Sequence, residues 1–212
     1  IATLIKNEIV DFTFIITGLI IGSTIGVIIA RKVSMTAMPQ MVALFNGLGG
    51  GASAFVALAE YYRLTGGLKP HIIISMIISI FVGAVTLTGS LVAFGKLQGI
   101  IKSAPIVFKA QRFLNILIFT LFLIAGVLLI TNPANNAYLL AILAIAMILG
   151  ILLVIPIGGA DMPVVISLLN SCSGLAAAAT GFVLSNNILI ICGALVGASG
   201  MILTRIMCKA MN

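Results

Sequence analysis

The sequence predicts an all-α integral membrane protein, a bundle of about seven transmembrane helices. Of its 212 residues 62% are hydrophobic and 7% charged, and the mean hydropathy is +1.34. The apolar runs approach or exceed the roughly 20 residues that cross a bilayer as a helix. They are apolar on every side, whereas strands of a membrane barrel alternate polar and apolar residues. The first run is followed by six more, so it is not simply a signal peptide.

Turn signals divide the apolar residues into seven expected spans within one transmembrane domain, residues 1–212. The spans are 9–30, 38–62, 71–95, 113–131, 136–156, 163–185 and 187–208. Basic residues follow spans one, three, five and seven: Arg31, Lys32, Lys96, Lys102, Lys109, Arg112, Arg205 and Lys209. The opposite side holds Lys6, Arg63 and Lys69. By the positive-inside rule the carboxyl end lies inside and the amino end outside. Basic residues scattered in this way argue against a nucleic-acid partner.

Two segments 124 residues apart share a pattern. Met38, Pro39, Asn46 and Gly50 recur as Met162, Pro163, Asn170 and Gly174. Residues 83–90 are similar to residues 193–200. Spans one to three therefore echo spans five to seven, and the copies run in the same direction because four spans separate them, as in a parallel internal repeat. Chance similarity among apolar helices is the alternative, since few residues carry the pattern.

Each copy places one asparagine inside an apolar helix, where hydrocarbon offers no hydrogen-bond partner. Asn46 and Asn170 follow their prolines by seven residues, which places them roughly 10 Å from the inner face. Ser90 reaches a similar depth, and Thr86 lies one turn further out. We expect a polar layer of Asn46, Asn170 and Ser90 that binds water or relays a proton. An amide does not titrate, so a proton-binding step requires another group. The alternative is that these residues only join helices by hydrogen bonds.

Asp161 is the only acidic residue among the inner connections. It directly precedes span six, where its carboxylate can cap free backbone amides. The alternative is a gate or a docking point for a soluble partner. The capping role is the favoured interpretation from the residues alone.

The other titratable residues are expected to have ordinary surface roles. Glu8 and Asp11 lie at the outer start of span one and are interpreted as solvated or interfacial. Glu60 belongs to an interfacial belt and is positioned for an ion pair with Arg63. His71 is the sole histidine, but its place at the outer start of span three predicts a loop residue rather than a proton carrier.

No cofactor-binding or metal-binding residues are expected in the chain. Residues 47–52 satisfy the dinucleotide pattern G-x-G-x-x-G/A, but they lie inside a span rather than at a turn from a strand into a helix. Cys172, Cys192 and Cys208 lack paired C-x-x-C spacing and are interpreted as packing residues. Small residues in spans two, six and seven predict close helix packing. Spans four and five are expected to face lipid.

Residues 35–47, 88–99, 157–167 and 206–212 resemble the membrane domain of proton-translocating NAD(P) transhydrogenase, in its beta subunit. The resemblance covers nearly the whole chain, and residues 158–163, Gly-Gly-Ala-Asp-Met-Pro, are its most specific part. It implies an enzyme that passes hydride between NADH and NADP on separate soluble domains, driven by protons that cross this membrane domain. This segment would itself carry no hydride-transfer site.

The resemblance also implies partners. These are an alpha subunit with an NAD(H)-binding domain and further transmembrane helices, an NADP(H)-binding domain after Asn212, and a homodimer of the whole assembly. The implied location is the bacterial cytoplasmic membrane or the mitochondrial inner membrane, with the carboxyl end on the cytoplasmic or matrix side.

By motif match, Ser90 and Asn170 correspond to positions of the family's proton path. Asp161 corresponds to a position that couples the channel to the NADP(H) domain. Asn46 departs from the branch that has a histidine there. We therefore predict the branch in which the proton acceptor comes from a helix of the alpha part.

Two other functions are compatible with the same hydropathy and repeat pattern. One is a stand-alone secondary transporter with a polar site at the membrane midplane. The other is a purely structural anchor, in which both asparagines could become leucine without functional loss.

Overall fold

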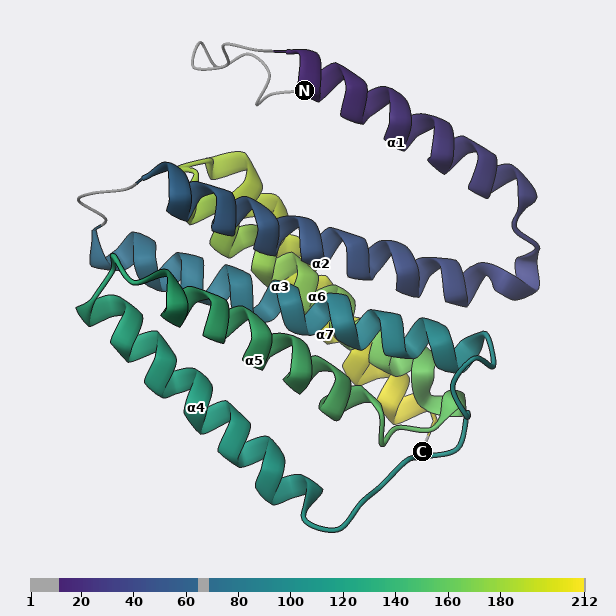
Figure 1. Cartoon of the computed structure of the whole chain (residues 1–212). Helices are drawn as coiled ribbons and strands as arrows, with labels where there is room; N and C mark the ends of the chain where they lie inside the picture. Colours follow the sequence, from purple (N-terminus) through teal and green to yellow (C-terminus); the bar gives the residue numbers. More distant parts are fainter. Residues whose placement is uncertain (1–11, 65–68, 212) are drawn as a thin grey trace. The chain divides into compact units, whose positions relative to one another are not determined.

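The computed structural model describes residues 12–64 and 69–211, which form helices and their connections (Figure 1). Glu8, Asp11, Asn212 and the expected start of span one at residue 9 lie outside the described residues. The chain divides into two units, residues 1–38 and 39–212, and each is described by itself. The first unit holds helix α1, Thr13–Lys32, and the 3-10 helix η2, Met35–Ala37.

The second unit contains α2 from Pro39 onward and all later helices. Their bounds are α2 Met38–Arg63, α3 Pro70–Leu97, α4 Gln111–Thr131, α5 Asn136–Val154, η3 Gly159–Asp161, α6 Met162–Val183 and α7 Asn187–Met211. Within the described residues, the seven α-helices are long and apolar enough to cross a membrane. The predicted fold class, an all-α membrane bundle, is confirmed. Among spans two to seven the largest difference lies at the end of α7, expected at residue 208 and found at Met211.

Local sequence signals account for the helix ends. Pro70 occupies the first turn of α3, where its missing amide hydrogen has no intrahelical partner to lose. The side chain of Asn135 caps α5 by accepting a hydrogen bond from the amide of Ala137 at 3.0 Å. After α6 the chain turns at Ser185, whose φ is +51°, and Asn186 Oδ1 accepts from the amide of Leu189 at 3.2 Å. These short turns join α6 to α7 and α4 to α5 as hairpins.

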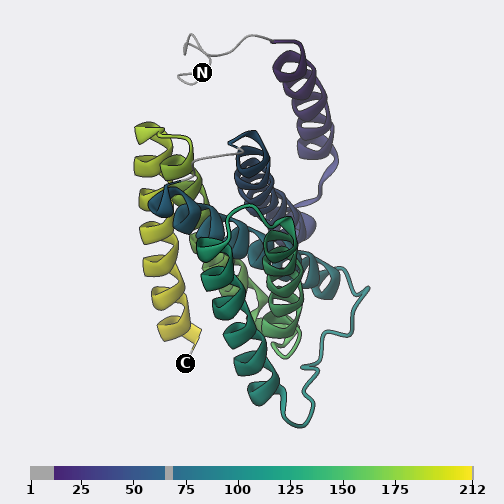
Figure 2. The ribbon, with the colours of Figure 1, turned by 60° about the vertical axis from the view of Figure 1, so that its left-hand side comes forward.

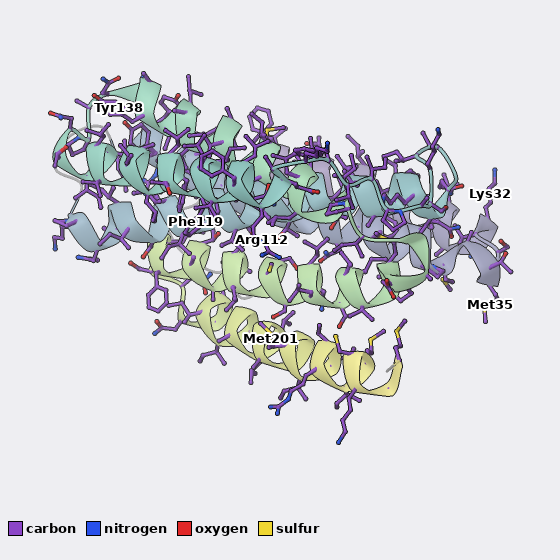
Figure 3. The ribbon with its side chains drawn as sticks, turned by 90° about the horizontal axis from the view of Figure 1, so that it is seen from below. Lys32, Met35, Arg112, Phe119, Tyr138 and Met201 are labelled. Atoms are coloured by element: carbon purple, nitrogen blue, oxygen red, sulfur yellow. The ribbon has the colours of Figure 1, made fainter. Side chains whose placement is uncertain are left out.

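Helix α3 occupies the centre of the second unit. It packs against α4, α5 and α6, and glycines of α2 approach it closely. Helix α7 lies alongside α6 (Figures 1 and 2). Most atoms of the side chains are carbon, and large apolar side chains such as Phe119 and Met201 are exposed (Figure 3). Such an outer surface suits hydrocarbon rather than water.

Helix α5 corrects the expectation that spans four and five both face lipid. Its inner face packs between α3 and α4, and Leu139, Ile142 and Ala146 are fully buried. Gly150 allows this contact, because a Cβ there would lie 3.0 Å from the Cα of Val85 on α3. Helix α4 exposes most of its side chains. Apolar composition alone did not separate a helix that packs on one face from a peripheral one.

The internal repeat reappears in local conformation and in packing. A single turn of 3-10 helix precedes both α2 and α6, and the residues before these turns have nearly equal dihedral angles: φ −71° and ψ 154° for Ser34, φ −69° and ψ 156° for Gly158. A Cβ on Gly50 would lie 3.1 Å from the carbonyl oxygen of Gly83, and one on Gly174 2.9 Å from that of Gly193. The pairs α2–α3 and α6–α7 therefore approach through equivalent glycines, which supports duplication over chance.

Candidate functional site

Three polar side chains meet where α2, α3 and α6 adjoin. Nδ2 of Asn46 donates to Oγ of Ser90 at 3.1 Å, and Oγ of Ser173 donates to Oδ1 of Asn46 at 2.8 Å. Ser90 is fully buried, while Asn46 and Ser173 are half-buried. We call Asn46, Ser90 and Ser173 the Asn46 cluster. Its amide joins two hydroxyl groups from two other helices.

Glycine next to Asn46 explains why these helices come so close. A Cβ on Gly47 would lie 2.9 Å from the Cβ of Ser90 and 3.3 Å from the carbonyl oxygen of Leu87. Only a residue without a side chain allows α2 to approach α3 at this level. Apolar residues pack beside the cluster, among them Ala43 and Ala93, which are both fully buried. The sequence therefore places a polar contact inside an otherwise apolar junction.

Asn170 lies one turn from the Asn46 cluster, but its side chain is exposed on α6. Its backbone carbonyl oxygen lies 2.9 Å from Ser173 Oγ and competes with Asn46 Oδ1 for the single hydrogen of that hydroxyl. Within the described residues, no hydrogen bond links its amide group to that of Asn46. The structure thus joins Asn46 to Ser90 directly and to Asn170 only through Ser173 and the backbone. An exposed amide on a helix of this kind needs a partner from water or another protein segment.

A second polar cluster lies seven residues further along α2 and α6. The hydroxyls of Ser79 and Thr180 are 2.6 Å apart, and they lie 3.2 and 3.4 Å from the carbonyl oxygen of Ser53. Seven helical residues correspond to about 10 Å. Thr86 does not connect the clusters, because its hydroxyl donates to Val82 O of its own helix at 2.7 Å.

The contact of Gly50 with Thr86 separates these two clusters. A Cβ on Gly50 would lie 2.8 Å from the Cβ of Thr86. The interpretation of the sequence did not include Ser79, Thr180 or Ser173. The seven-residue spacing from Ser173 to Thr180, which places both on one face of α6, is the signal that could have identified them.

Lys96 is the other residue whose role the sequence did not reveal. Its side chain is 1% exposed, and Nζ donates to the carbonyl oxygens of Ile155 and Ile157 at 2.6 Å each and of Ala104 at 3.4 Å. These three carbonyls match the three donors of an ammonium group. Lys96 was counted among the charges that orient the helices, yet it is buried within the protein. It holds the connection between α5 and α6 that leads to Asp161.

The structure does not support capping by Asp161. The residue stands at the N-cap position of α6, but its side chain makes no capping hydrogen bond and it is exposed. Its φ of −89° and ψ of −1° are helical, whereas a capping residue usually has extended dihedral angles. Asp161 lines a cavity of about 350 Å³ between the start of α6 and the end of α7, together with Val165, Leu168, Thr204, Cys208 and neighbouring residues. Its carboxylate is therefore free to meet a partner.

The remaining expectations have mixed outcomes. Glu60 forms the expected ion pair with Arg63, at 2.6 Å from Oε1 to Nη2. His71 is exposed at the start of α3. Cys172 is half-buried, but Cys192 and Cys208 are exposed, so packing inside this chain does not explain those two.

Residues 47–52 lie within α2, and the Cβ positions of Gly47 and Gly50 are occupied by α3. This glycine segment therefore cannot hold a dinucleotide, whose phosphates need free amides at a helix start. Among the described residues, no group of three or more His, Cys, Asp or Glu side chains could hold a metal ion.

Comparison with known proteins identifies relatives over the full chain. The family model described as NAD(P) transhydrogenase beta subunit matches residues 1–212. Two similar proteins from Rhodospirillum rubrum, both named NAD(P) transhydrogenase subunit beta, are each 46% identical over 217 aligned residues. The alignments cover 99% of this chain and 47% of each relative. The chain thus spans about half the length of the curated relatives it matches.

Proposed function

Because the chain belongs to the NAD(P) transhydrogenase beta subunit family, we propose that it couples proton movement across the membrane to hydride transfer between NADH and NADP. Hydride transfer itself would take place on separate soluble domains. The observation that carries the proposal is the Asn46 cluster, a polar contact between three helices of an apolar bundle. Seven helices fit for crossing a bilayer agree with an integral membrane protein.

The chemistry of the Asn46 cluster suits a relay that does not store the proton. Its hydroxyls can rotate, and each can donate one hydrogen bond while it accepts others. Asn46 holds Ser90 and Ser173 in place through its two different ends, but an amide does not titrate. Because none of the three side chains of the Asn46 cluster can hold the proton, the proposal assigns the proton acceptor to a helix of the alpha subunit. The exposed amide of Asn170 is a further group that such a helix could meet.

Asp161 couples the channel to the nucleotide domains in this proposal. It is exposed at the end of the bundle where α7 finishes, and the NADP(H)-binding domain would follow Asn212. The connection before Asp161 is held by Lys96 and by the hydrogen bond from Gly159 N to Ser103 O at 2.8 Å. A force on the exposed carboxylate would thus reach α6, the helix that carries Ser173. The full assembly would contain the alpha subunit with its NAD(H)-binding domain, and it would be a homodimer.

The proposal is tested by substitutions on α6 in the assembled enzyme in liposomes. Asn170→Leu should abolish proton pumping, measured with a pH-sensitive dye, and leave nucleotide binding unchanged. Ser173→Ala removes the donor to Asn46 and should lower the pumping rate about tenfold, the factor that corresponds to about 1.4 kcal/mol in a barrier.

Ser171→Ala is the matched control. Ser171 lies two residues from Ser173 on α6, but its hydroxyl donates to the carbonyl oxygen of Gly197 at 2.5 Å, outside the Asn46 cluster. Ser171→Ala should lower the free energy of unfolding by about 1 kcal/mol and leave the ratio of protons moved to hydride transferred unchanged. Full pumping by Asn170→Leu, or equal loss of pumping in both serine variants, would contradict the proposal.

The family relationship does not favour the stand-alone transporter. The purified chain in liposomes distinguishes the two functions. A coupled channel should be inactive until the alpha subunit and the NADP(H)-binding domain are added. Solute uptake by the chain alone would support the transporter instead.

A further inference from the structure

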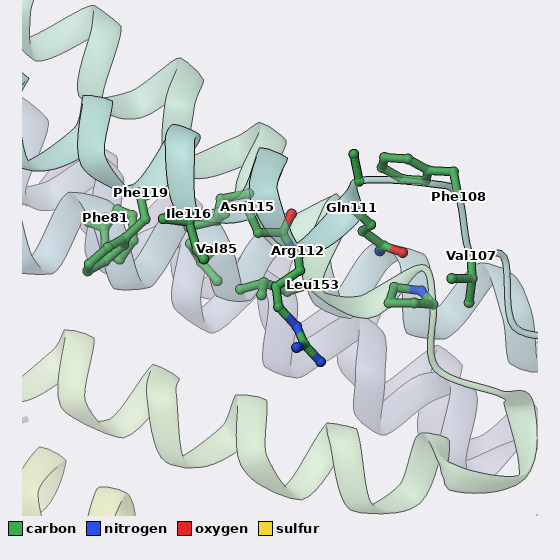
Figure 4. A pocket seen from close by; sticks show the side chains of 13 residues that line it. Phe81, Val85, Val107, Phe108, Gln111, Arg112, Asn115, Ile116, Phe119 and Leu153 are labelled. Atoms are coloured by element: carbon green, nitrogen blue, oxygen red, sulfur yellow. The ribbon is translucent and has the colours of Figure 1, made fainter.

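A cavity of about 820 Å³ lies between α3, α4, α5 and the connection before α4, apart from the Asn46 cluster. This volume falls within the range of roughly 300–1,000 Å³ that is common for ligand sites. Its walls are mostly apolar: Phe81 and Val85 of α3, Ile116 and Phe119 of α4, and Leu149 and Leu153 of α5. Figure 4 shows the α4 side chains in succession along the cavity, from Phe119 through Ile116 and Asn115 to Arg112.

One end of the cavity is basic. Arg112 lines it, and Lys102 and Lys109 lie in the connection that leads to α4. Neither acid in the described part of the chain pairs with Arg112, because Glu60 binds Arg63 and Asp161 lines the other cavity. The seven residues from Arg112 to Phe119 extend about 10 Å along α4. The cavity therefore begins at a cationic group and continues as an apolar slot.

Besides Arg112, the polar residues of α4 that line the cavity are Gln111 and Asn115. Oδ1 of Asn115 is inaccessible to solvent and has no hydrogen-bond partner within the described residues. Asn115 is one of the cavity's lining residues. By contrast, the neighbouring Gln111 is anchored, since its Nε2 donates to the carbonyl oxygen of Leu152 at 3.1 Å. The oxygen of Asn115 is closed off from the cavity, so it is not a contact for a ligand in this arrangement.

The lining favours a lipid over a helix of another subunit. Helices in membranes associate through small residues, as at Gly174 and Gly193 here. This cavity is walled by bulky phenylalanine, leucine and isoleucine side chains. A flexible acyl chain can follow such walls, and no glycine among the lining residues would bring a helix of another subunit close.

We propose that this cavity binds an anionic phospholipid, with an acyl chain along Phe81, Ile116 and Phe119 and the phosphate beside Arg112. Phosphate is the natural partner of an unpaired guanidinium at the end of an apolar slot. The site lies on the side of α3 that is covered by α4 and α5, so it is separate from the contacts of α2 and α6 that carry the proposed relay.

Native mass spectrometry of the assembled enzyme tests this site with phosphatidylglycerol and phosphatidylcholine of identical acyl chains. The unmodified enzyme should retain phosphatidylglycerol preferentially. Arg112→Gln should lower that preference about fivefold, the effect of one basic residue near an anionic headgroup. Leu153→Phe narrows the slot without changing charge and should reduce retention of both lipids. Arg205→Gln, an exposed arginine on α7 outside the cavity, should leave the preference unchanged.

Three outcomes would overturn the proposal. They are equal retention of the two lipids by the unmodified enzyme, an unchanged preference in Arg112→Gln, and an equal decrease in Arg112→Gln and Arg205→Gln. A map of the assembled enzyme with a helix of another subunit in the cavity would overturn it as well. Hydride transfer between nucleotides with the purified enzyme serves as the folding control for every variant.

Discussion

At the residue scale, the buried polar groups of the bundle differ in their hydrogen-bond partners. Lys96 and Ser171 bind backbone carbonyls, and Ser79 and Thr180 bind each other and the carbonyl of Ser53. Asn46 instead binds side-chain hydroxyls of Ser90 and Ser173. Hydroxyl groups can reorient while the helices stay in place. Asn46 lies between two such hydroxyls from different helices, one turn from the exposed amide of Asn170, and we therefore place the proposed relay there.

Lys96→Met should destabilise the connection between α5 and α6. The substitution removes the donor to the carbonyl of Ile157 and leaves the carbonyl of Ile155 with only the amide of Ile106 at 3.3 Å. A carbonyl left without a donor costs about 1–3 kcal/mol. We expect a lower melting temperature of the assembled enzyme and faster hydrogen exchange in residues 155–161. The control is Lys102→Met, because Lys102 is exposed. Equal melting temperatures for both variants would show that Lys96 has no such role.

The sequence predicted part of the candidate site because rise along a helix is fixed. Counting residues placed Asn46 and Ser90 at a similar depth, and the structure joins them by a hydrogen bond of 3.1 Å. The direction in which a side chain points depends on how neighbouring helices rotate and pack. Counting residues could therefore not predict that the side chain of Asn170 is exposed. Asp161 was assigned a capping role that it does not have, because the 3-10 turn before α6 gives it helical dihedral angles.

At the element scale, glycines decide how closely helices approach. Gly50 of α2 contacts Thr86 and Gly83 of α3, whereas Gly49 beside it has no atom of another element within 4 Å of its Cβ position. The two residues are adjacent in the sequence but point to different sides of α2. They form a matched pair for measuring what close packing contributes.

Gly50→Ala should lower stability by about 1–3 kcal/mol, the usual cost of overpacking a tight interface. The added methyl would lie 2.8 Å from the Cβ of Thr86 and force α2 away from α3. Gly49→Ala should be neutral or slightly stabilising, since alanine favours helix more than glycine does. Thermal unfolding of the assembled enzyme in detergent measures both. Equal melting temperatures would disprove the tight contact.

The presence of the helices was predictable from hydropathy, because a segment that crosses hydrocarbon must pair its backbone polar groups internally, as a helix does. Hydropathy did not predict which helices pack against each other. Spans four and five have similar apolar compositions, yet α5 packs on α3 through Gly150 while α4 exposes Phe113, Leu123 and Val127. Packing depends on a few small residues on one helix face, and their partners lie far away in the sequence.

At the scale of the whole molecule, the distribution of basic residues predicts topology. Arg205 and Lys209 near the end of α7 should remain on the cytoplasmic or matrix side. A green fluorescent protein fused after Asn212 should therefore fluoresce in bacterial cells, and an alkaline phosphatase fused there should be inactive. An active phosphatase fusion would reverse the predicted orientation. Fusions after Leu64, between α2 and α3, should show the opposite pattern.

Composition and the repeated Met-Pro and Asn positions were sufficient to predict apolar helices of membrane-spanning length and a duplicated pattern, whereas the family was indicated by the resemblance of residues 35–47, 88–99, 157–167 and 206–212. Composition suffices for the helices because spanning a bilayer is a matter of length and hydropathy along one segment. Tertiary structure alone decided that Asn46 binds Ser90 and Ser173, that Lys96 is enclosed by three carbonyls, and that Arg112 stands at an apolar cavity. Each of these arrangements brings together groups from different helices or connections, and their relative positions depend on packing across the bundle.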